Sequence, residues 1–376
     1  MTRAEKRDTA GNNNRCGETL HTFLHKRIRI CGTNAKTPLS SPLDVAQFWR
    51  IAYPMPNRRD VLKLATTAAA AALAGKTTTS TASAAEEPAF KISLAEWSLN
   101  KRMFKKGGEE PLDRLDFCKT ARGFGIDGVE YVNQMFFDKA EDKAYLGEMI
   151  KRQEGEGVKG LIIMCDREGN LGDPDDAKRK QTVQNHLKWL DAAATLGCHS
   201  IRVNAASNPK LPAEEQMKLA ADGLHQLCVE GDKRNLFVVV ENHGGLSSNG
   251  QWLTSVMKMA DHPRVGILPD FGNFYTNRDT GELYNPYKGL REFMPWVKQA
   301  VSAKAYNWDT GAGKFFTEDL REGREMTLDF KRLIEIVLKA GYHGYIGIEF
   351  EGDLQDEMTG IRRTKEVLEQ IRASLA

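Results

Sequence analysis

The sequence predicts an α/β protein folded as a single (β/α)8 TIM barrel, and two observations carry this prediction. From residue 90 onward, strand-like runs alternate with helix-like segments, with no linker rich in Pro, Gly or Ser between them. Three runs, at 236–241, 265–270 and 345–349, consist mostly of apolar β-formers and end in an acid. Such runs are typical of buried parallel strands, and their last residues lie at the edge where TIM barrels carry their active sites.

The order of elements fits eight strand–helix units. Strands are expected at 91–96, 128–131, 160–164, 200–203, 236–241, 265–270, 300–304 and 345–349. Amphipathic helices are expected between them, among them 181–196, 213–231 and 328–340. Thr327 is the expected N-cap of the last of these, and Gly341 should end it. No Gly-x-Gly-x-x-Gly follows the first strand, which weakens a dinucleotide-binding alternative.

The N-terminal part of the chain is expected to be a targeting signal and not a folded domain. Arg58-Arg59, a weakly apolar stretch at 64–75 and a small-x-small site at 82–84 resemble a twin-arginine export signal. We therefore expect a signal at 55–85, a periplasmic location and a barrel spanning 90–376. Residues 1–54 are expected to be disordered or an over-extended reading frame. The apolar stretch is too short for stable membrane insertion.

Composition excludes some functional classes. The formal charge is +2, but residues 1–85 hold 13 basic and 5 acidic residues, which leaves 40 basic and 46 acidic residues in the body. An acidic body gives no electrostatic reason to expect nucleic acid as a partner. The four cysteines of the body lack C-x-x-C spacing, so we expect free thiols in the core and no cysteine-based zinc site.

The acids at the strand ends indicate a metal centre. Glu241, Asp270 and Glu349 would repel one another at one edge unless a cation lies between them, and a divalent metal is the simplest choice. His243 lies two residues after Glu241, so in extended backbone it would face the same way and bind the metal or a substrate oxygen. Lys304 is expected to act on the substrate, since an ammonium has no lone pair for a metal. A salt bridge with Glu349 is the alternative.

Other residues near strand ends could bind a sugar. Polar groups suited to sugar hydroxyls are expected at Glu130, Arg202, Asn204 and Asn273. Aromatic walls are expected from Trp97, Phe271, Tyr306 and Trp308. Two plainer interpretations remain: Arg202 could simply neutralise Glu130, and the aromatic residues could simply pack.

Three motifs, Glu241-Asn-His-Gly-Gly245, Leu268-Pro-Asp-Phe-Gly-Asn273 and Ile346-Gly-Ile-Glu-Phe-Glu-Gly352, resemble those of the xylose-isomerase-like barrels, the sugar phosphate isomerase/epimerase superfamily. The resemblance covers residues 90–376. It implies one divalent metal (Mn, Mg, Co or Zn) held by Glu, Asp, His and Glu on strands five to eight. Glu241, Asp270 and Glu349 fill three of these places. On strand seven Ser302 stands where histidine is expected.

The resemblance also implies a reaction, namely isomerisation or epimerisation of a free sugar, keto-sugar or related polyol. Glu241 or Glu349 would remove a proton next to a carbonyl, and the other would return one. A keto-sugar dehydratase or lyase could use the same site. The departure at Ser302 keeps a non-catalytic sugar-binding barrel open. An endonuclease is disfavoured because it needs several metals and a basic groove. The expected partner is a small carbohydrate, and a homo-oligomer is possible.

Overall fold

The computed structural model describes residues 87–375, and within them eight parallel strands form one sheet. The strands are β1 (Lys91–Ala95), β2 (Gly128–Val132), β3 (Lys159–Met164), β4 (Ser200–Val203), β5 (Phe237–Glu241), β6 (Val265–Leu268), β9 (Val301–Ala305) and β12 (Tyr345–Phe350). Their order is β6-β5-β4-β3-β2-β1-β12-β9. All eight expected strands are therefore present, with ends that differ from the expected ones by at most two residues. The predicted fold class is confirmed.

The sheet closes between β6 and β9 through a short seam. β6 ends two residues before the expected Asp270 because Pro269 has no N–H to donate to a ladder. Beyond that point, Ser302 N donates to Pro269 O at 2.8 Å and Phe271 N donates to Ser302 O at 3.0 Å. A parallel bridge joins Asp270 to Ser302. These bonds replace a regular ladder and complete the barrel.

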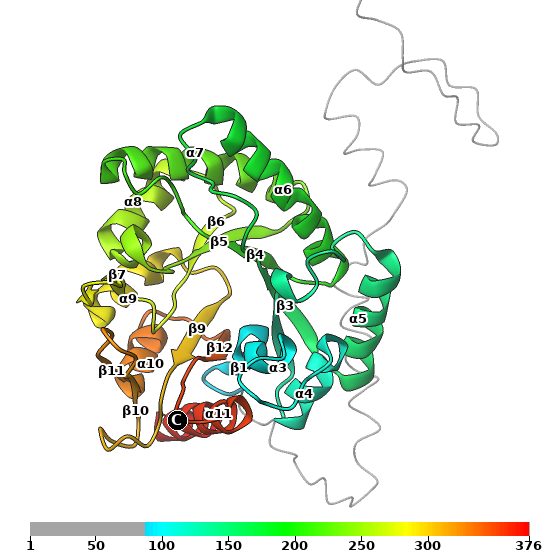
Figure 1. Ribbon diagram of the computed structural model, residues 1–376, viewed down its shortest axis with the longest axis vertical. Coiled ribbons are helices and arrows are strands. Elements are labelled where there is room, and N and C mark those ends of the chain that lie inside the picture. The colour runs from blue at the N-terminus through cyan, green and yellow to red at the C-terminus, as the bar shows by residue number, and fades with distance from the viewer. Residues whose placement is uncertain (1–86, 376) are drawn as a thin grey trace, which may run out of the picture. The chain divides into compact units, whose positions relative to one another are not determined.

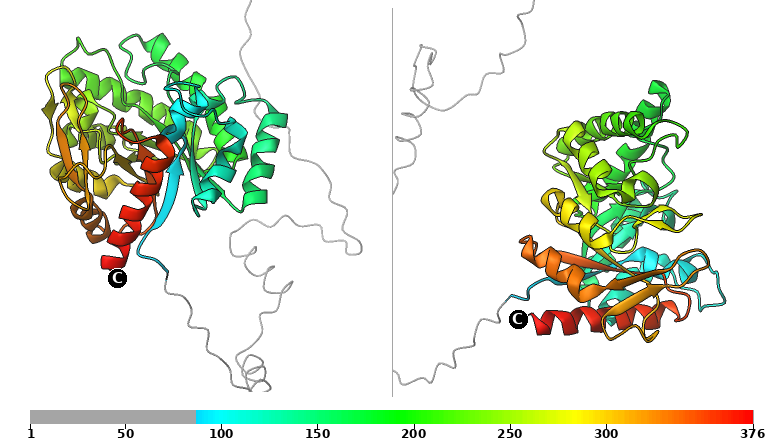
Figure 2. Two further views of the ribbon diagram at one scale, coloured as in Figure 1. Left: turned by 60° about the horizontal axis from the view of Figure 1, so that its bottom comes forward. Right: turned by 90° about the vertical axis from the view of Figure 1, so that its left-hand side faces the viewer.

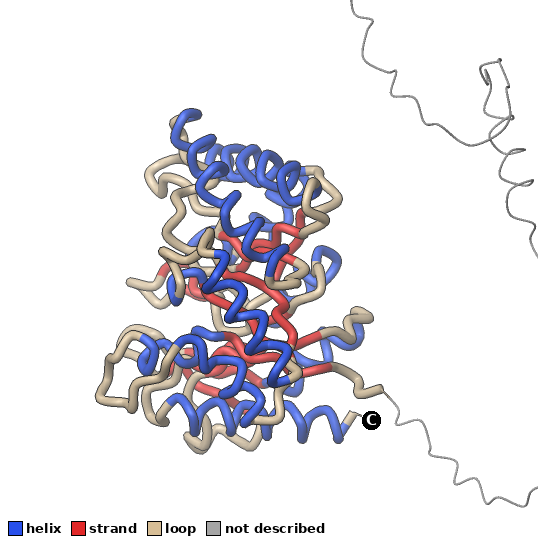
Figure 3. The backbone as a smooth tube through the Cα atoms, turned by 90° about the vertical axis from the view of Figure 1, so that its right-hand side faces the viewer, coloured by secondary structure: helices blue, strands red, loops and turns tan. Residues whose placement is uncertain are grey.

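Helices lie outside the strands (Figures 1 and 3). They are α3 (Asn100–Met103), α4 (Phe117–Gly123), α5 (Lys143–Glu156), α6 (Asp176–Thr195), α7 (Ala213–Asp232), α8 (Gly250–Ala260), α9 (Pro286–Phe293), α10 (Phe330–Lys339) and α11 (Glu357–Ser374). An Asp or Asn side chain accepts backbone N–H groups at the start of α5, α6, α8, α9, α10 and α11. These caps satisfy donors that have no partner within the helix and so fix where each helix begins.

Two antiparallel hairpins extend the loops after β6 and β9. They are β7 (Tyr275–Asn277) with β8 (Glu282–Leu283), and β10 (Phe316–Asp319) with β11 (Met326–Asp329). The second hairpin corrects the expected cap of the helix at 328–340. Thr327 lies in β11 and donates to Glu318 Oε1 at 2.9 Å, while Asp329 caps α10.

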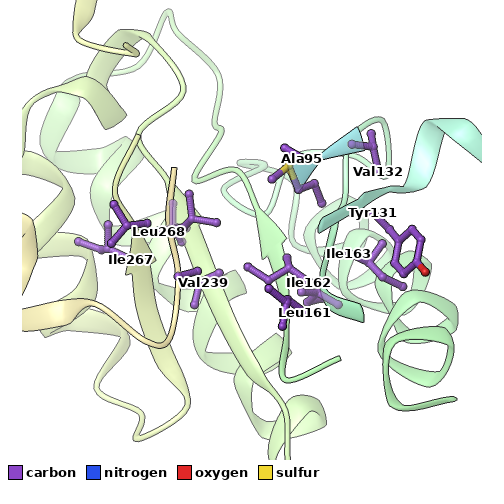
Figure 4. Packing of buried hydrophobic residues seen from close by; sticks show 14 of the residues in the cluster. Ala95, Tyr131, Val132, Leu161, Ile162, Ile163, Val239, Ile267 and Leu268 are labelled. Atoms are coloured by element: carbon purple, nitrogen blue, oxygen red, sulfur yellow. The ribbon is translucent and has the colours of Figure 1, made fainter. Parts of the chain in front are cut away.

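The core fills the space between the strands and the surrounding helices. Figure 4 shows side chains from several strands packed together, among them Ala95, Ile162, Val239 and Ile267. Cys118, Cys165, Cys198 and Cys228 are all buried and free, as expected. The first and last parts of the described residues lie together, where α11 packs on β12 and Arg372 Nη1 donates to Phe90 O at 3.1 Å (Figure 2).

Within the described residues, no helix combines the length and hydropathy needed to cross a membrane. The expected signal at 55–85 and the segment 1–54 lie outside the described residues.

Glu96 is a buried acid just beyond β1. Its side chain is 2% exposed, and Oε2 accepts a hydrogen bond from Val132 N at 2.8 Å. Burial raises the pKa of Glu96 from 4.5 to about 8, although the Val132 bond and Arg114 oppose that shift. Because the folded state binds this proton more tightly than the unfolded chain, Glu96 contributes stability that is full at low pH. That stability is lost as the pH rises through about 8.

We therefore expect Glu96→Gln to flatten the pH dependence of stability. The variant keeps a carbonyl oxygen for Val132 N but has no proton to lose. Between about pH 5 and about pH 9, wild type should lose more stability than the variant, with an upper limit of about 5 kcal/mol. Urea midpoints at the two pH values measure this, with exposed Glu154→Gln on α5 as the control. Equal loss in wild type and Glu96→Gln would contradict the assignment.

Candidate active site and metal centre

The predicted acids meet at the C-terminal edge of the barrel. Glu241 is the last residue of β5, Asp270 follows β6 by two residues, and Glu349 lies near the end of β12. Each offers a carboxylate oxygen within 4.8 Å of the other two, and all three residues are buried. Strands far apart in the chain therefore bring three negative groups into one small volume.

Lys304 provides a cation inside this group. Its Nζ lies 2.9 Å from Glu349 Oε1, 3.6 Å from Asp270 Oδ2 and 3.9 Å from Glu241 Oε1. It is also 3.6 Å from Glu351 Oε1. Burial alone would lower the pKa of Lys304, but the surrounding carboxylates raise it well above its usual value. The ammonium thus neutralises the acids directly, which is the salt bridge with Glu349 given as the alternative in the sequence analysis. Its action on a substrate stays a prediction.

Ser302 stands at the place where histidine was expected. Its Oγ lies 3.1 Å from Asp270 Oδ2 and 3.2 Å from Glu349 Oε2, so its single proton can be donated to either carboxylate. The side chain points into the acid group, as a ligand would, but it contributes a neutral donor. Ser302 therefore links two acids at the position where an imidazole was expected.

Glu241 is held by two further residues. Asn273 Nδ2 donates to Oε1 at 2.8 Å, and Arg202 Nε lies 2.8 Å from Oε2. Arg202 also donates from Nη1 to Asp166 Oδ1 at 2.9 Å, and Asn204 donates to the same oxygen at 2.8 Å. Burial alone would raise the pKa of Glu241, but Arg202, together with other nearby cations, lowers it. Arg202 therefore pairs with Glu241 and Asp166, and not chiefly with Glu130.

Glu130 lies deeper than expected. It sits in the middle of β2, two residues before the strand ends, and its Oε1 accepts from Ser93 Oγ at 2.7 Å. It does not line the cavity beside the acids. Gly347 has no side chain and so leaves room for this carboxylate inside the barrel. Burial raises the pKa of Glu130 to about 7. The prediction that it lies at a strand end, open to substrate, is wrong.

A cavity of about 490 Å³ opens beside the acid group, and Glu349 is the member of the group that lines it. Trp97 lines it from the turn after β1, and its Nε1 donates to Glu351 Oε1 at 2.6 Å. Tyr306 also lines the cavity, as expected. Phe271 and Trp308 do not; both pack edge-to-face on Phe330 of α10, with ring centroids 5.6 and 5.0 Å away. Those two aromatic residues are packing residues, so half of the expected aromatic wall is present.

His243 lies beside the acids but not among them. It lines the 490 Å³ cavity and a neighbouring cavity of about 980 Å³ that Asn204 also lines. Its backbone is fixed by Ser247 Oγ, which accepts from His243 N at 2.9 Å. Burial lowers the pKa of His243, which favours a neutral imidazole. Among residues 87–375, the one group of closely spaced ligand atoms contains three carboxylates and no histidine.

The match to known proteins agrees with this geometry. The family model of the xylose isomerase-like TIM barrel matches residues 118–372. The chain belongs to this family. No curated protein matches the sequence.

Solved structures show the same fold at low sequence identity. The 3-keto-D-glucoside 4-epimerase YcjR from E. coli superposes with a TM-score of 0.56 at 17% identity, covering 76% of this chain and 99% of its own. A D-tagatose 3-epimerase-like protein gives 0.55 at 18%, covering 76% and 100%. A xylose isomerase-like TIM barrel protein from Mycobacterium smegmatis, solved in complex with magnesium, gives 0.56 at 15%, covering 76% and 98%. At these identities the likeness establishes the fold.

The site of this xylose isomerase-like barrel fits a divalent cation. The donors are three carboxylates, and oxygen ligands of this kind suit hard cations such as Mg²⁺ or Mn²⁺. Glu241 Oε2 is buried and has no hydrogen bond, since the N–H of Arg202 Nε is not aligned with it. A buried oxygen with a free lone pair is available to a metal. Lys304 would have to leave its place among the acids when a second cation enters.

Sequence reasoning missed two acids of the site. Asp166 follows the apolar end of β3, and Glu351 lies two residues after Glu349, so it leaves the strand on the same side. The signal used for the other three acids, a carboxylate after an apolar run, would have found Asp166, and the two-residue period of an extended strand beyond Glu349 would have found Glu351. Lys304 and Arg321 lower the pKa of Glu351 to about 2 although burial opposes this.

Replacing Lys304 tests whether it competes with a metal. In Lys304→Met the three buried acids lose their shared cation, so the metal-free variant should be destabilised by about 3–5 kcal/mol. Added Mn²⁺ should then raise the unfolding temperature more in the variant than in wild type, because binding to the folded state alone stabilises it. Differential scanning calorimetry with and without Mn²⁺ measures both effects. Lys339→Met, on the exposed end of α10, is the control. An equal Mn²⁺ shift in Lys304→Met and wild type would exclude competition.

Proposed function

We propose that this protein is a divalent-metal-dependent sugar isomerase or epimerase acting on a keto-sugar or a related polyol. The observation that carries the proposal is the group of Glu241, Asp270 and Glu349 at the catalytic edge of the barrel, beside a cavity that Glu349 lines. Membership of the xylose isomerase-like family and the sugar epimerases among its structural neighbours support the same class.

The metal would be held by these three carboxylates. A bound divalent cation supplies Lewis-acid chemistry, which polarises a carbonyl and makes the adjacent C–H more acidic. Its identity is proposed as Mg²⁺ or Mn²⁺ from the all-oxygen donor set, and the magnesium complex of the Mycobacterium smegmatis relative is consistent with that choice.

Two glutamates of the chain would carry out the proton transfer. Glu241 and Glu349 come from β5 and β12, which are separated by four strands in the sheet order and by β6 and β9 across the seam, so two different strands supply them. One carboxylate takes the proton from the carbon next to the carbonyl, and the other delivers a proton. Delivery to the opposite face of the same carbon gives epimerisation. Delivery to the neighbouring carbon, with a hydroxyl proton moving to the carbonyl oxygen, gives isomerisation.

Neighbouring groups hold these carboxylates in place. Asn273 donates to Glu241 Oε1, Arg202 forms an ion pair with Glu241 Oε2, and Ser302 lies within hydrogen-bond distance of Glu349 Oε2. Fixed acids lose little freedom on meeting the substrate, which favours proton transfer at a defined atom. The neutral imidazole of His243, at the cavity wall, is suited to hydrogen-bond a substrate oxygen.

Metal content tests the ligand assignment. Glu349→Gln removes one carboxylate from the group and should lower bound Mn²⁺ far below one ion per chain while the barrel stays folded. Glu154→Gln is the control, because it removes an exposed carboxylate on the outer helix α5, outside the group of three. Inductively coupled plasma mass spectrometry after dialysis gives the ratio. Unchanged metal in Glu349→Gln, or equal loss in both variants, would refute the assignment.

Isotope exchange tests the proposed proton transfer whichever product the enzyme forms. In D₂O, NMR should show the C–H next to the carbonyl of D-fructose, D-tagatose or a 3-keto-D-glucoside exchanging for deuterium. Glu241→Gln and Glu349→Gln should each slow this exchange by about 10²–10⁴-fold. Glu154→Gln, on the outer helix α5, should leave it unchanged. Exchange that persists at the wild-type rate in both site variants would contradict the proton-transfer roles.

A further inference from the structure

The cavity beside the acids has a cationic wall although the body of the chain is acidic. The residues that line it include six with cationic side chains and only three with acidic ones. Of the cations near the acids, Lys304 and Arg202 pair with the site carboxylates. Arg321 pairs with Asp319 through two bonds of 2.7 Å and lies 3.7 Å from Glu351. Each of these three cations therefore already has a carboxylate partner within the protein.

Three further arginines on the wall have no such partner. Arg167, Arg278 and Arg324 all line the cavity, and within residues 87–375 none has a carboxylate oxygen within 4.0 Å of its guanidinium. A neutral sugar needs no unpaired guanidinium groups, because its hydroxyls are satisfied by uncharged donors and acceptors. A guanidinium fork matches the oxygens of a carboxylate or a phosphate.

The three arginines come from three different loops of the catalytic edge. Arg167 follows β3, Arg278 lies in the turn between β7 and β8, and Arg324 lies in the turn between β10 and β11. The two hairpins are additions to the strand–helix plan of the barrel, and each delivers one arginine. Convergence of separate loops on one cavity distinguishes these residues from arginines scattered over a surface.

Local structure holds two of them. Arg278 donates from Nη2 to His243 O at 3.2 Å, and its guanidinium lies against Gly244, where a Cβ would come within 3.1 Å of Nη2. Because residue 244 is glycine, no side chain occupies the space in which the Arg278 guanidinium lies. Arg167 has a φ of +64°, a conformation that non-glycine residues adopt only when the surrounding structure holds them there.

A buried hydroxyl on the same wall also has no partner. Tyr275 is 3% exposed and lines the cavity, and within the described residues its hydroxyl makes no hydrogen bond. An unpaired buried hydroxyl is costly unless a ligand or water completes it. Tyr275 begins β7, the strand that leads to Arg278. The unpaired hydroxyl and the unpaired guanidinium groups therefore occur in one cavity wall.

We propose that the wall formed by Arg167, Arg278, Arg324 and Tyr275 binds an anionic substituent of the substrate, a carboxylate or a phosphate. This inference rests on the proposed function for the reacting end of the substrate, which lies toward the acids. The wall arginines then hold the charged end of the molecule away from the metal ligands. The substrate class is an acidic sugar: a sugar acid if the group is a carboxylate, or a sugar phosphate if it is a phosphate.

Binding to probes of matched shape tests the proposal. Isothermal titration of the Mn²⁺-loaded protein compares D-glucuronate and D-glucose 6-phosphate with D-glucose, which lacks the charge. We expect at least one anion to bind about 10–100-fold more tightly than glucose, as charge-assisted hydrogen bonds of this kind allow. Preference for glucuronate identifies a carboxylate, and preference for the phosphate identifies a phosphate. Equal binding of all three probes would overturn the proposal.

Substitutions of the wall arginines test whether these residues cause the preference for anionic over neutral probes. Arg278→Gln and Arg324→Gln, alone and combined, should abolish most of the preference for the anion while leaving glucose binding and Mn²⁺ content unchanged. Arg291→Gln is the matched control, since Arg291 is exposed on α9, has no carboxylate within 4.0 Å among residues 87–375, and lies away from the cavity. A preference that survives in the double variant would overturn the assignment.

The outcome is separable from that of the proposed function. Deuterium exchange into a neutral keto-sugar together with equal binding of all probes would leave the isomerase proposal standing and remove the anion site. Anion preference without exchange into any keto-sugar, whether neutral or charged (D-fructose 6-phosphate and D-fructuronate), would do the reverse. Calorimetric unfolding of each variant confirms that a lost preference does not come from a lost fold.

Discussion

The central constraint of this structure is the burial of three carboxylates within 4.8 Å of one another. Two like charges about 4 Å apart repel by roughly 4 kcal/mol even at the moderate effective dielectric constant of a protein surface. The fold must therefore deliver positive charge or protons to the same place. Lys304 from β9 and Arg202 from β4 supply the charge, and Ser302 supplies a neutral hydrogen bond. Burial raises the pKa of Asp270 well above its usual value, although Lys304 opposes that shift.

The same residues also close the barrel. Asn242 donates from Nδ2 to the backbone oxygens of Asp270 and Asn273, and its Oδ1 accepts from Asp270 N. On the other side, Ser302 forms the backbone bonds that connect the end of β6 to β9. Asp270 thus belongs to both the acid group and the seam. A cation that relieves the acids stabilises the closure of the sheet, which links metal binding to fold stability.

The sequence was sufficient for the strands and the acids, because both follow from local patterns. An apolar run that ends in a carboxylate determined Glu241, Asp270 and Glu349, and the alternation of elements determined the barrel. The sequence was insufficient to show how far from the end of its strand each acid lies, and this distance decides whether the acid reaches the cavity. Glu130 and Glu349 both follow β-formers, but β2 continues for two residues beyond Glu130, which places it inside the barrel. The position of Lys304 among three acids depends on β5, β6 and β12 together, and no local pattern contains that information.

The account claims that one divalent cation binds Glu241, Asp270 and Glu349 and displaces the ammonium of Lys304. Crystals grown with Mn²⁺ and measured at the manganese absorption edge test this most directly. The account predicts one anomalous peak in contact with all three carboxylates, with Lys304 Nζ moved away from Glu349 Oε1. No peak at this position, or Lys304 still in contact with all three acids in Mn²⁺-saturated crystals, would contradict it.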